Sequence, residues 1–195
     1  MKKLFLFAFL LFNASFVFAQ KADTTISKLG KTKNVNGTIM SSSKDIIENI
    51  SAAPEFAVLT YAIKTAELTD SFKSAGPVTL FAPTAKAFAK LPVGQLDTLL
   101  LPPHKAELVN LLNYHAIAGK ISSKDIISQI KANNGQATYT TLSGGILTAR
   151  INENRNIVLT DENGGQSVIS IFDIQQSNGM LHVVTAVLTP KSKTM

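Results

Sequence analysis

The sequence predicts an α+β fold, in which a β-sheet wedge or sandwich has helices packed against it. Two observations carry this prediction. Apolar residues recur at helical spacing up to about residue 132, and from Gln136 onward they alternate with polar residues in short runs that turn residues separate. The 195 residues include no cysteine, so an ordinary apolar core rather than a disulfide framework has to stabilise the fold.

Seven helices and one strand are expected in the first part of the domain. The helices begin after Ser43, at Pro54, near residue 66, after Thr84, near Gln95, after Pro103 and after Ser123, and the strand spans residues 78–81. Ser and Thr side chains accept hydrogen bonds from the free N–H groups at a helix start, and Pro is favoured at the first helical position. In the helix after Pro103, the apolar stripe that begins at Leu108 ends at His115.

One short sequence occurs twice. Residues 42–47 and 122–127 are the same hexapeptide, Ser-Ser-Lys-Asp-Ile-Ile. Both copies precede apolar residues at helical spacing, so both are expected to begin a helix. Six residues do not make a domain repeat, and we interpret the identity as one good helix start that is used twice.

Five strands are expected in the second part. They cover residues 138–142, 146–151, 157–160, 168–174 and 180–188, with Gly- and Asn-rich connections between them. Short connections of this kind join antiparallel neighbours, so the sheet should be mainly antiparallel. The last strand is apolar on both faces, and we expect it to be central and covered on both sides.

The first 19 residues have the pattern of a secretory signal peptide. Lys2 and Lys3 precede an apolar block over residues 4–12, and Ala19 precedes the expected cleavage site at Gln20. This block is shorter than the roughly 20 apolar residues that cross a bilayer, and no second block of this kind follows it. We therefore expect an exported protein, periplasmic or extracellular, with no stable membrane span.

The rest of the chain divides into a polar segment, one domain and a short tail. Residues 20–41 are polar with no sustained apolar period, and we expect them to form a flexible leader. Residues 42–190 are expected to form a single domain, followed by a tail over residues 191–195. The formal net charge is +6, but the basic residues are scattered. Nucleic-acid binding needs a clustered basic face, so no nucleic-acid partner is expected.

Two segments and a dipeptide between them carry a family resemblance. Residues 79–91 hold a short apolar strand and a helix start, and residues 178–190 hold an Asn-Gly turn and an apolar run. Together with Tyr114-His115, these segments resemble the signature blocks of the fasciclin-like (FAS1) domain, and the resemblance implies an α+β fold. The chain departs from the family pattern at Ala85, where Asn or Asp is usual, and at Thr185, where Asp is frequent.

The resemblance implies binding rather than catalysis. FAS1 domains are found in secreted and surface-anchored proteins, where they are chiefly associated with adhesion. Two family features implicated in adhesion match this chain, and they mark Tyr114, His115, Asp173 and Ile174 as candidate partner-binding residues. A structural role is the alternative for each pair, because Ile174 continues the apolar side of its strand and Asp173 is placed to cap a turn.

The residues give no sign of catalytic or metal chemistry. Cysteine nucleophiles are excluded, and the sequence contains no Gly-x-Ser-x-Gly elbow, no phosphate-binding Gly loop and no dinucleotide fingerprint. The three histidines, His104, His115 and His182, include no pair at the close spacing that zinc ligands usually have. We therefore predict no enzyme activity, no catalytic residue, no cofactor and no metal site.

The sequence thus predicts a secreted, non-enzymatic adhesion or interaction module that binds a protein or glycan at the cell surface or in the periplasm. One alternative is a carrier of a small hydrophobic ligand, since some FAS1-like proteins bind such molecules. A second alternative is a hydrolase in which His115 acts with Tyr114 and Asp173. The sequence predicts no particular oligomeric state.

Overall fold

The computed structural model describes residues 30–74 and 76–191. The predicted signal peptide over residues 1–19, the first ten residues of the predicted leader and residues 192–195 of the predicted tail lie outside the described residues. The elements are, in chain order, β1 (Thr32–Val35), β2 (Thr38–Ser41), α1 (Ile46–Ser51), η2 (Pro54–Phe56), α2 (Ala57–Thr65), α3 (Thr69–Ser74), β3 (Val78–Pro83), α4 (Ala85–Phe88), α5 (Gln95–Leu99), η3 (Pro102–His104), α6 (Lys105–Tyr114), β4 (Ala116–Ala118), α7 (Ser123–Ala132), β5 (Ala137–Thr140), β6 (Ile146–Ile151), β7 (Ile157–Thr160), β8 (Gln166–Gln176) and β9 (Gly179–Val184).

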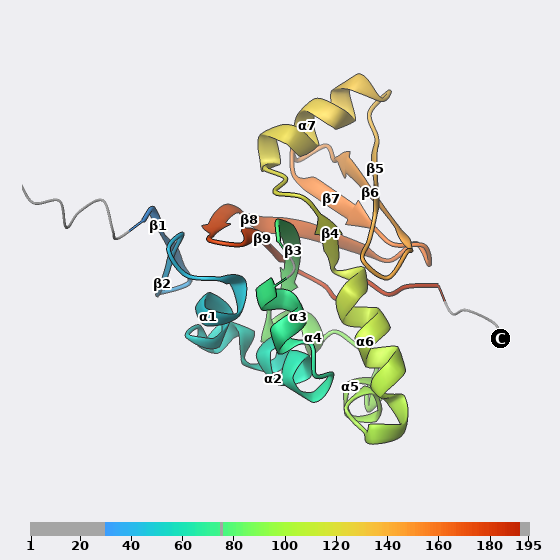
Figure 1. The fold of residues 1–195 in the computed structure, drawn as a ribbon. Helices are drawn as coiled ribbons and strands as arrows, with labels where there is room; N and C mark the ends of the chain where they lie inside the picture. The colour runs from blue at the N-terminus through green and yellow to red at the C-terminus, as the bar shows by residue number, and fades with distance from the viewer. Residues whose placement is uncertain (1–29, 75, 192–195) are drawn as a thin grey trace, which may run out of the picture.

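A seven-stranded sheet with the order β4-β3-β9-β8-β7-β6-β5 forms the centre of the described part of the chain. Neighbouring strands are antiparallel except β3 and β9, which run parallel with Leu80 opposite Leu181. The sheet curls until its two ends meet, where the N–H of Leu142 donates to the Ala116 carbonyl at 2.8 Å. The result is a wedge with α1 to α6 on one side and α7 against β5 and β6 at the other end (Figure 1).

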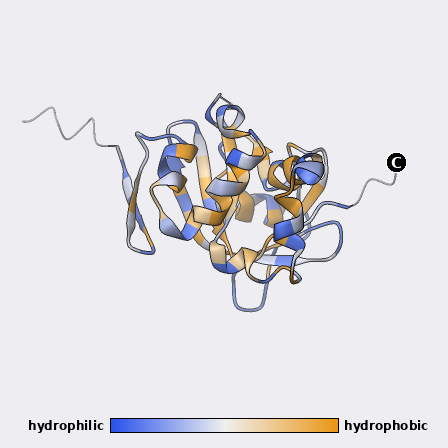
Figure 2. Cartoon of the chain, turned by 90° about the horizontal axis from the view of Figure 1, so that it is seen from below, coloured by the Kyte–Doolittle hydropathy of each residue, from blue (hydrophilic) through white to orange (hydrophobic). Residues whose placement is uncertain are grey.

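Two apolar clusters fill this wedge. The larger one lies between the helices α1 to α6 and the sheet, and it includes Phe56 and Leu108. The second lies within the curl of the sheet and under α7, and it includes Tyr114 and Ile126. Hydrophobic segments accordingly gather toward the middle of the molecule, while hydrophilic segments lie mostly toward its outside (Figure 2).

The α+β prediction and the mainly antiparallel sheet are confirmed. Strand β9 is buried along all six residues and lies between β3 and β8, as expected of a central strand. Strand β4 was not predicted, because three residues are too few to show an alternating pattern. Thr84 caps α4 as predicted, but the other two predicted caps are displaced: Asp45 caps α1 and Ser122 caps α7.

The prediction of a flexible leader through residue 41 is wrong for its last part. Residues 32–41 form the β1–β2 hairpin, whose Val35 and Met40 side chains are 0% and 1% exposed and belong to the larger apolar cluster. The turn consists of Asn36 and Gly37, whose φ angles of 46° and 97° suit the left-handed turn of a two-residue hairpin. This Asn-Gly pair was the available sequence signal, and ordered structure begins before residue 42.

Candidate functional site

The four candidate partner-binding residues do not form an exposed surface. Tyr114, His115 and Ile174 are 0%, 1% and 1% exposed, and Asp173 is half-buried. The three buried side chains therefore cannot touch a partner in this conformation. Their contacts within the domain favour the structural alternative for both pairs.

Tyr114 joins the end of α6 to two turns of the sheet. Its hydroxyl donates to the Ile146 carbonyl at 2.6 Å and accepts from the Glu162 N–H at 3.1 Å. The ring also needs Gly145, because a Cβ at that position would lie 2.6 Å from the ring carbon Cε2. Burial raises the pKa of Tyr114 to about 12, so the hydroxyl stays protonated and available as a donor.

His115 joins α6 to the segment that follows β9. Its Nδ1 lies 2.9 Å from the Leu111 carbonyl, and its Nε2 accepts from the Leu188 N–H at 3.0 Å. A carbonyl only accepts, so Nδ1 carries the proton of a neutral ring. Burial lowers the pKa of His115 to about 4. Both nitrogens are occupied, and the ring has no free position for general-base chemistry.

Asp173 fixes α7 to the sheet, and Ile174 packs in the core. Asp173 lies at an irregular part of the β8–β9 pairing with φ of 54°, and its carboxylate accepts from the N–H and hydroxyl of Ser123 at 2.7 and 2.5 Å. The N–H of Asp173 donates to His182 Nδ1 at 3.3 Å, and His182 Nε2 lies 3.0 Å from the Ile121 carbonyl. Ile174 packs in the larger apolar cluster. Asp173 therefore holds the start of α7, while Ile174 has a structural role on the side of α1 to α6.

Sequence reasoning missed two further internal contacts. Buried Asp161 accepts from the N–H groups of Gly165 and Thr189 at 2.7 and 2.8 Å, which ties the β7–β8 turn to the chain after β9. Asn178 bonds the Ile46 N–H and the Phe72 carbonyl at 3.1 and 2.7 Å. An Asp or Asn within a turn suggests such contacts only locally, so the distant partners could not be predicted.

The described residues contain neither a metal-binding cluster nor a membrane-spanning helix. Within residues 30–74 and 76–191, no three His, Asp or Glu side chains converge in a way that could hold a metal ion. Nor does any helix of these ranges have the length and apolar character that crossing a membrane requires. Two surface features of the described residues are candidate binding sites: an apolar tip and a groove.

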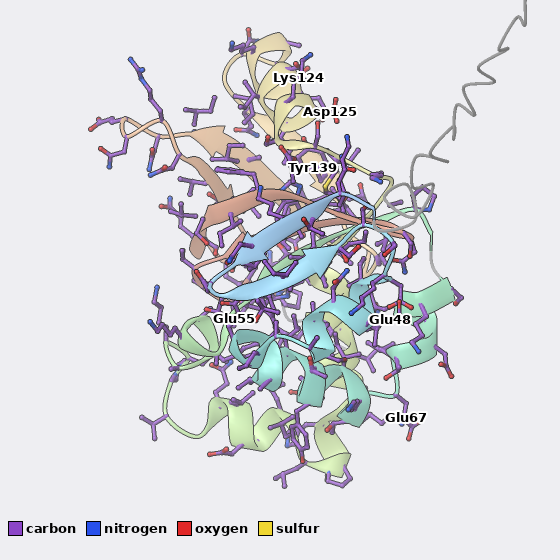
Figure 3. All side chains as sticks on the ribbon, turned by 90° about the vertical axis from the view of Figure 1, so that its left-hand side faces the viewer. Glu48, Glu55, Glu67, Lys124, Asp125 and Tyr139 are labelled. Atoms are coloured by element: carbon purple, nitrogen blue, oxygen red, sulfur yellow. The ribbon has the colours of Figure 1, made fainter. Side chains whose placement is uncertain are left out.

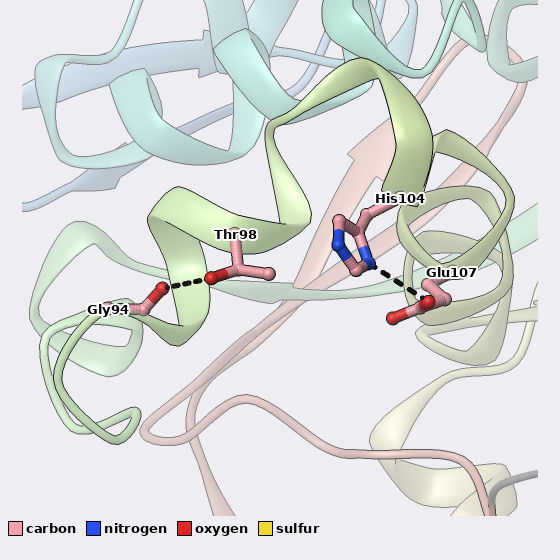
Figure 4. A network of polar contacts seen from close by, with 4 residues as sticks. All are labelled: Gly94, Thr98, His104 and Glu107. Carbon is pink, nitrogen blue, oxygen red and sulfur yellow. Dashed lines mark hydrogen bonds and ion pairs between the residues drawn. The ribbon is translucent and has the colours of Figure 1, made fainter.

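The α5 tip consists of residues 92–103, at the end of the molecule away from α7 (Figure 1). Val93 is fully exposed and Leu101 is 53% exposed, and these two side chains flank α5. The Thr98 hydroxyl donates to the Gly94 carbonyl at 2.9 Å, and His104 Nδ1 lies 3.0 Å from the Glu107 carboxylate (Figure 4). These contacts hold the tip in shape while its apolar side chains face solvent.

The groove has a volume of about 790 Å³ and lies where the parallel strands β3 and β9 end. One wall contains Lys86 and Lys90, and the other lining residues include Ile171, the end of β9, Glu55 and Asn36 of the hairpin turn. Figure 3 shows Glu55 near the β1–β2 hairpin and far from α7. The groove thus combines charged side chains with the partly exposed Ile171.

The fold and its surfaces define a class of protein: a small α+β domain whose buried polar side chains tie the backbone together and whose tip and groove face outward. The chain belongs to the fasciclin domain family, since the fasciclin domain model matches residues 54–190. The β1–β2 hairpin lies outside this matched range.

Three known proteins illustrate the range of the family. Protein sll1483 from Synechocystis sp. is 32% identical over 160 residues, which cover 82% of this chain and 81% of that protein. Periostin from Homo sapiens is 29% identical over 154 residues, which cover 79% of this chain but 16% of periostin. The FAS1 domain pair of the insect cell adhesion molecule fasciclin I matches with a TM-score of 0.66 at 16% identity, covering 83% of this chain and 57% of that one. This last likeness shows the shared fold.

Proposed function

We propose that this protein is an exported, non-enzymatic interaction module that binds a protein or glycan at the cell surface or in the periplasm. Its family supports the proposal, because the structural relative is described as a cell adhesion molecule. The reactive groups support it as well, since Tyr114, His115 and His182 are committed to hydrogen bonds within the domain. A hydrolase that uses His115 is not favoured by this arrangement.

The apolar α5 tip is the observation that carries the proposal. A helix of five residues is roughly 8 Å long, so the exposed Val93 and Leu101, which flank its two ends, belong to one small tip. Pro92, Pro102 and Pro103 beside them are exposed too. Single exposed apolar residues are ordinary, but apolar residues grouped on one rigid tip are typical of interaction sites.

Attachment to the cell envelope tests this proposal. Beads coated with the protein are incubated with envelope vesicles from the organism that makes it, and bound vesicles are counted. We expect the double variant Val93→Asp/Leu101→Asp to lose most attachment, because charge replaces the apolar contact area. Ile39→Asp is the matched control, since Ile39 is 58% exposed on β2, away from the tip. All variants should keep the wild-type melting temperature.

Two results would contradict the proposal. If beads coated with the wild type bound no vesicles, the adhesive role would be contradicted. If the wild type and the double variant bound equally well, the α5 tip would not be the binding surface. Export is tested separately by mass spectrometry of the protein recovered from its host. An amino terminus at Gln20 is expected, and an intact Met1 would contradict secretion through a cleaved signal peptide.

A further inference from the structure

The groove beside β3 and β9 is separate from the α5 tip, because none of its lining residues belongs to residues 92–103. Its volume of about 790 Å³ falls within the roughly 300–1,000 Å³ of ligand pockets. We propose that this groove binds a short acidic peptide segment of a partner protein. The proposal rests on the role of the protein as a binding module, but not on the tip.

The cationic wall supplies the charge complementarity. Lys86 and Lys90 line this wall, and both are exposed. Lys90 Nζ donates to the Thr185 carbonyl at 2.7 Å, which holds its ammonium group at the end of β9. Among the residues that the structure describes, neither lysine pairs with a carboxylate. Both ammonium groups are thus available to bind carboxylates of a ligand.

The groove offers an aliphatic contact but no aromatic one. Ile171 on β8 lines it and is partly exposed, whereas Val183 and Val184 at the end of β9 are 1% and 0% exposed, so β9 presents almost no side-chain surface there. None of the eleven lining residues is aromatic, whereas aromatic rings dominate contact area at many binding sites because they are large and rigid. An aliphatic side chain of a peptide can pack on Ile171, while a sugar ring would find no aromatic face to stack on. This lining therefore favours an acidic peptide over an acidic glycan.

The lining of the groove also carries an unpartnered acceptor. Oε1 of Glu55 is buried and accepts no hydrogen bond from the described residues. A buried oxygen without a donor is costly, and a bound group often supplies the partner. A peptide offers backbone N–H groups to Glu55 as well as carboxylates to the lysines. A simple inorganic anion offers only the second.

Two neutral residues keep the groove cationic. Ala85 and Thr185 both line it, and a carboxylate at either position would offset the lysine charges. Thr185 is the better position for a test, because its Oγ1 already accepts from the Val168 N–H at 3.0 Å. An aspartate there keeps an acceptor at the same place, so Thr185→Asp adds charge with little change of structure.

The test uses a fluorescein-labelled hexapeptide that alternates aspartate with valine. Its anisotropy is followed as the full-length mature protein is added, and amide chemical shifts locate the site. We expect shifts at Ile171 and over residues 183–185. Lys86→Glu/Lys90→Glu should weaken binding by about tenfold or more, since two charge-assisted contacts become repulsions. Thr185→Asp should weaken binding by about threefold.

The control variant makes the same change of charge elsewhere. Lys124→Glu/Lys131→Glu alters two exposed lysines of α7, and Figure 3 shows Lys124 far from Glu55. Salt screens charges over about 10 Å, so binding should change by less than about twofold. A hexapeptide that alternates lysine with valine should not bind the wild type.

Three results would overturn the proposal. The first is no binding of the acidic peptide, and the second is binding that Lys86→Glu/Lys90→Glu leaves unchanged. The third is tighter binding of a galacturonate hexamer at the same amides, which would make the groove a glycan site. Envelope attachment by the same variants separates the two proposals. If the wild type attaches to vesicles but does not bind the peptide, only the proposal for the groove is contradicted. If it binds the peptide but does not attach to vesicles, only the adhesive role of the tip is contradicted.

Discussion

His115 and His182 are both buried, and each bridges two backbone groups, but they carry the ring proton on opposite nitrogens. His115 donates from Nδ1 to the Leu111 carbonyl and accepts at Nε2. His182 donates from Nε2 to the Ile121 carbonyl and accepts at Nδ1 from the Asp173 N–H. A neutral imidazole has one donor and one acceptor at a fixed separation. The fold uses this property twice, and the position of the carbonyl decides the tautomer.

The two histidines differ in how well their partners are sealed from water. Both hydrogen bonds of His115 are buried, while those of His182 are partly buried and one is 3.3 Å long. His182 has a compensating contact, since its ring stacks on Phe81 with centroids 5.8 Å apart. Burial lowers the pKa of both rings. We infer that His115 contributes more to global stability, and that His182 mainly secures α7.

The largest effect on the free energy of unfolding is expected for His115→Ala. This change leaves a cavity and removes the partners of the Leu111 carbonyl and the buried Leu188 N–H. Together these losses should lower the free energy of unfolding by about 3–5 kcal/mol. Urea denaturation at pH 7 measures the loss. A loss below that of His182→Ala would reverse the ranking of the two histidines.

The second effect is a loss of stability in acid. The ordinary pKa of histidine is 6.5, and burial lowers that of His115 to about 4 in the folded protein. Between these two pH values the unfolded chain takes up a proton that the folded protein does not. The contribution of His115 to the free energy of unfolding is therefore at its maximum above pH 6.5, and it falls as the pH drops toward 4. At ~1.4 kcal/mol per unit, His115 alone accounts for roughly 3 kcal/mol.

Urea denaturation at pH 7, 5.5 and 4.5 measures this acid effect. The same series on His115→Ala is the control, and its stability should fall less between pH 7 and 4.5 because one titrating group is gone. If wild type and variant lost stability in parallel, the lowered pKa of His115 would not be the cause.

The third effect is a local one, at His182. His182→Ala should lower the free energy of unfolding by about 2 kcal/mol, because water can replace part of its partly buried hydrogen bonds. Hydrogen exchange should quicken at Ser123 and Asp173, which depend on the connection between α7 and β8. If hydrogen exchange quickened evenly over the whole domain, His182 would stabilise the whole domain, as His115 is expected to do, and not mainly the connection to α7.

Much of this architecture could be predicted from local pattern, but the ends of elements often could not. The two copies of the hexapeptide show why. In the first copy Asp45 is the cap, since Glu48 returns a bond to its N–H at 2.8 Å. In the second copy Ser122 is the cap and Asp125 returns the bond at 2.9 Å. The residue directly after the hexapeptide differs between the copies: Glu48 returns the bond to Asp45 in the first, and Ser128 stands at that place in the second.

The candidate site was predicted less well, because burial depends on contacts between distant segments. Asn178-Gly179 was interpreted as a turn, yet Gly179 lies in β9, where a Cβ would come within 1.9 Å of the Val78 carbonyl oxygen. The need for glycine there comes from the parallel pairing with β3, which local sequence does not reveal. Lys86, Lys90 and Glu55 likewise meet in one groove only after the hairpin and both signature blocks have folded together.

The smallest effect changes no stability and tests the comparison most directly. Nitrogen-15 shifts of the two rings at pH 7 should show protonated Nδ1 in His115 and protonated Nε2 in His182, because each proton faces a carbonyl. The same tautomer in both buried rings would mean that one of them cannot make the bonds described, and the ranking of their contributions would then have no basis.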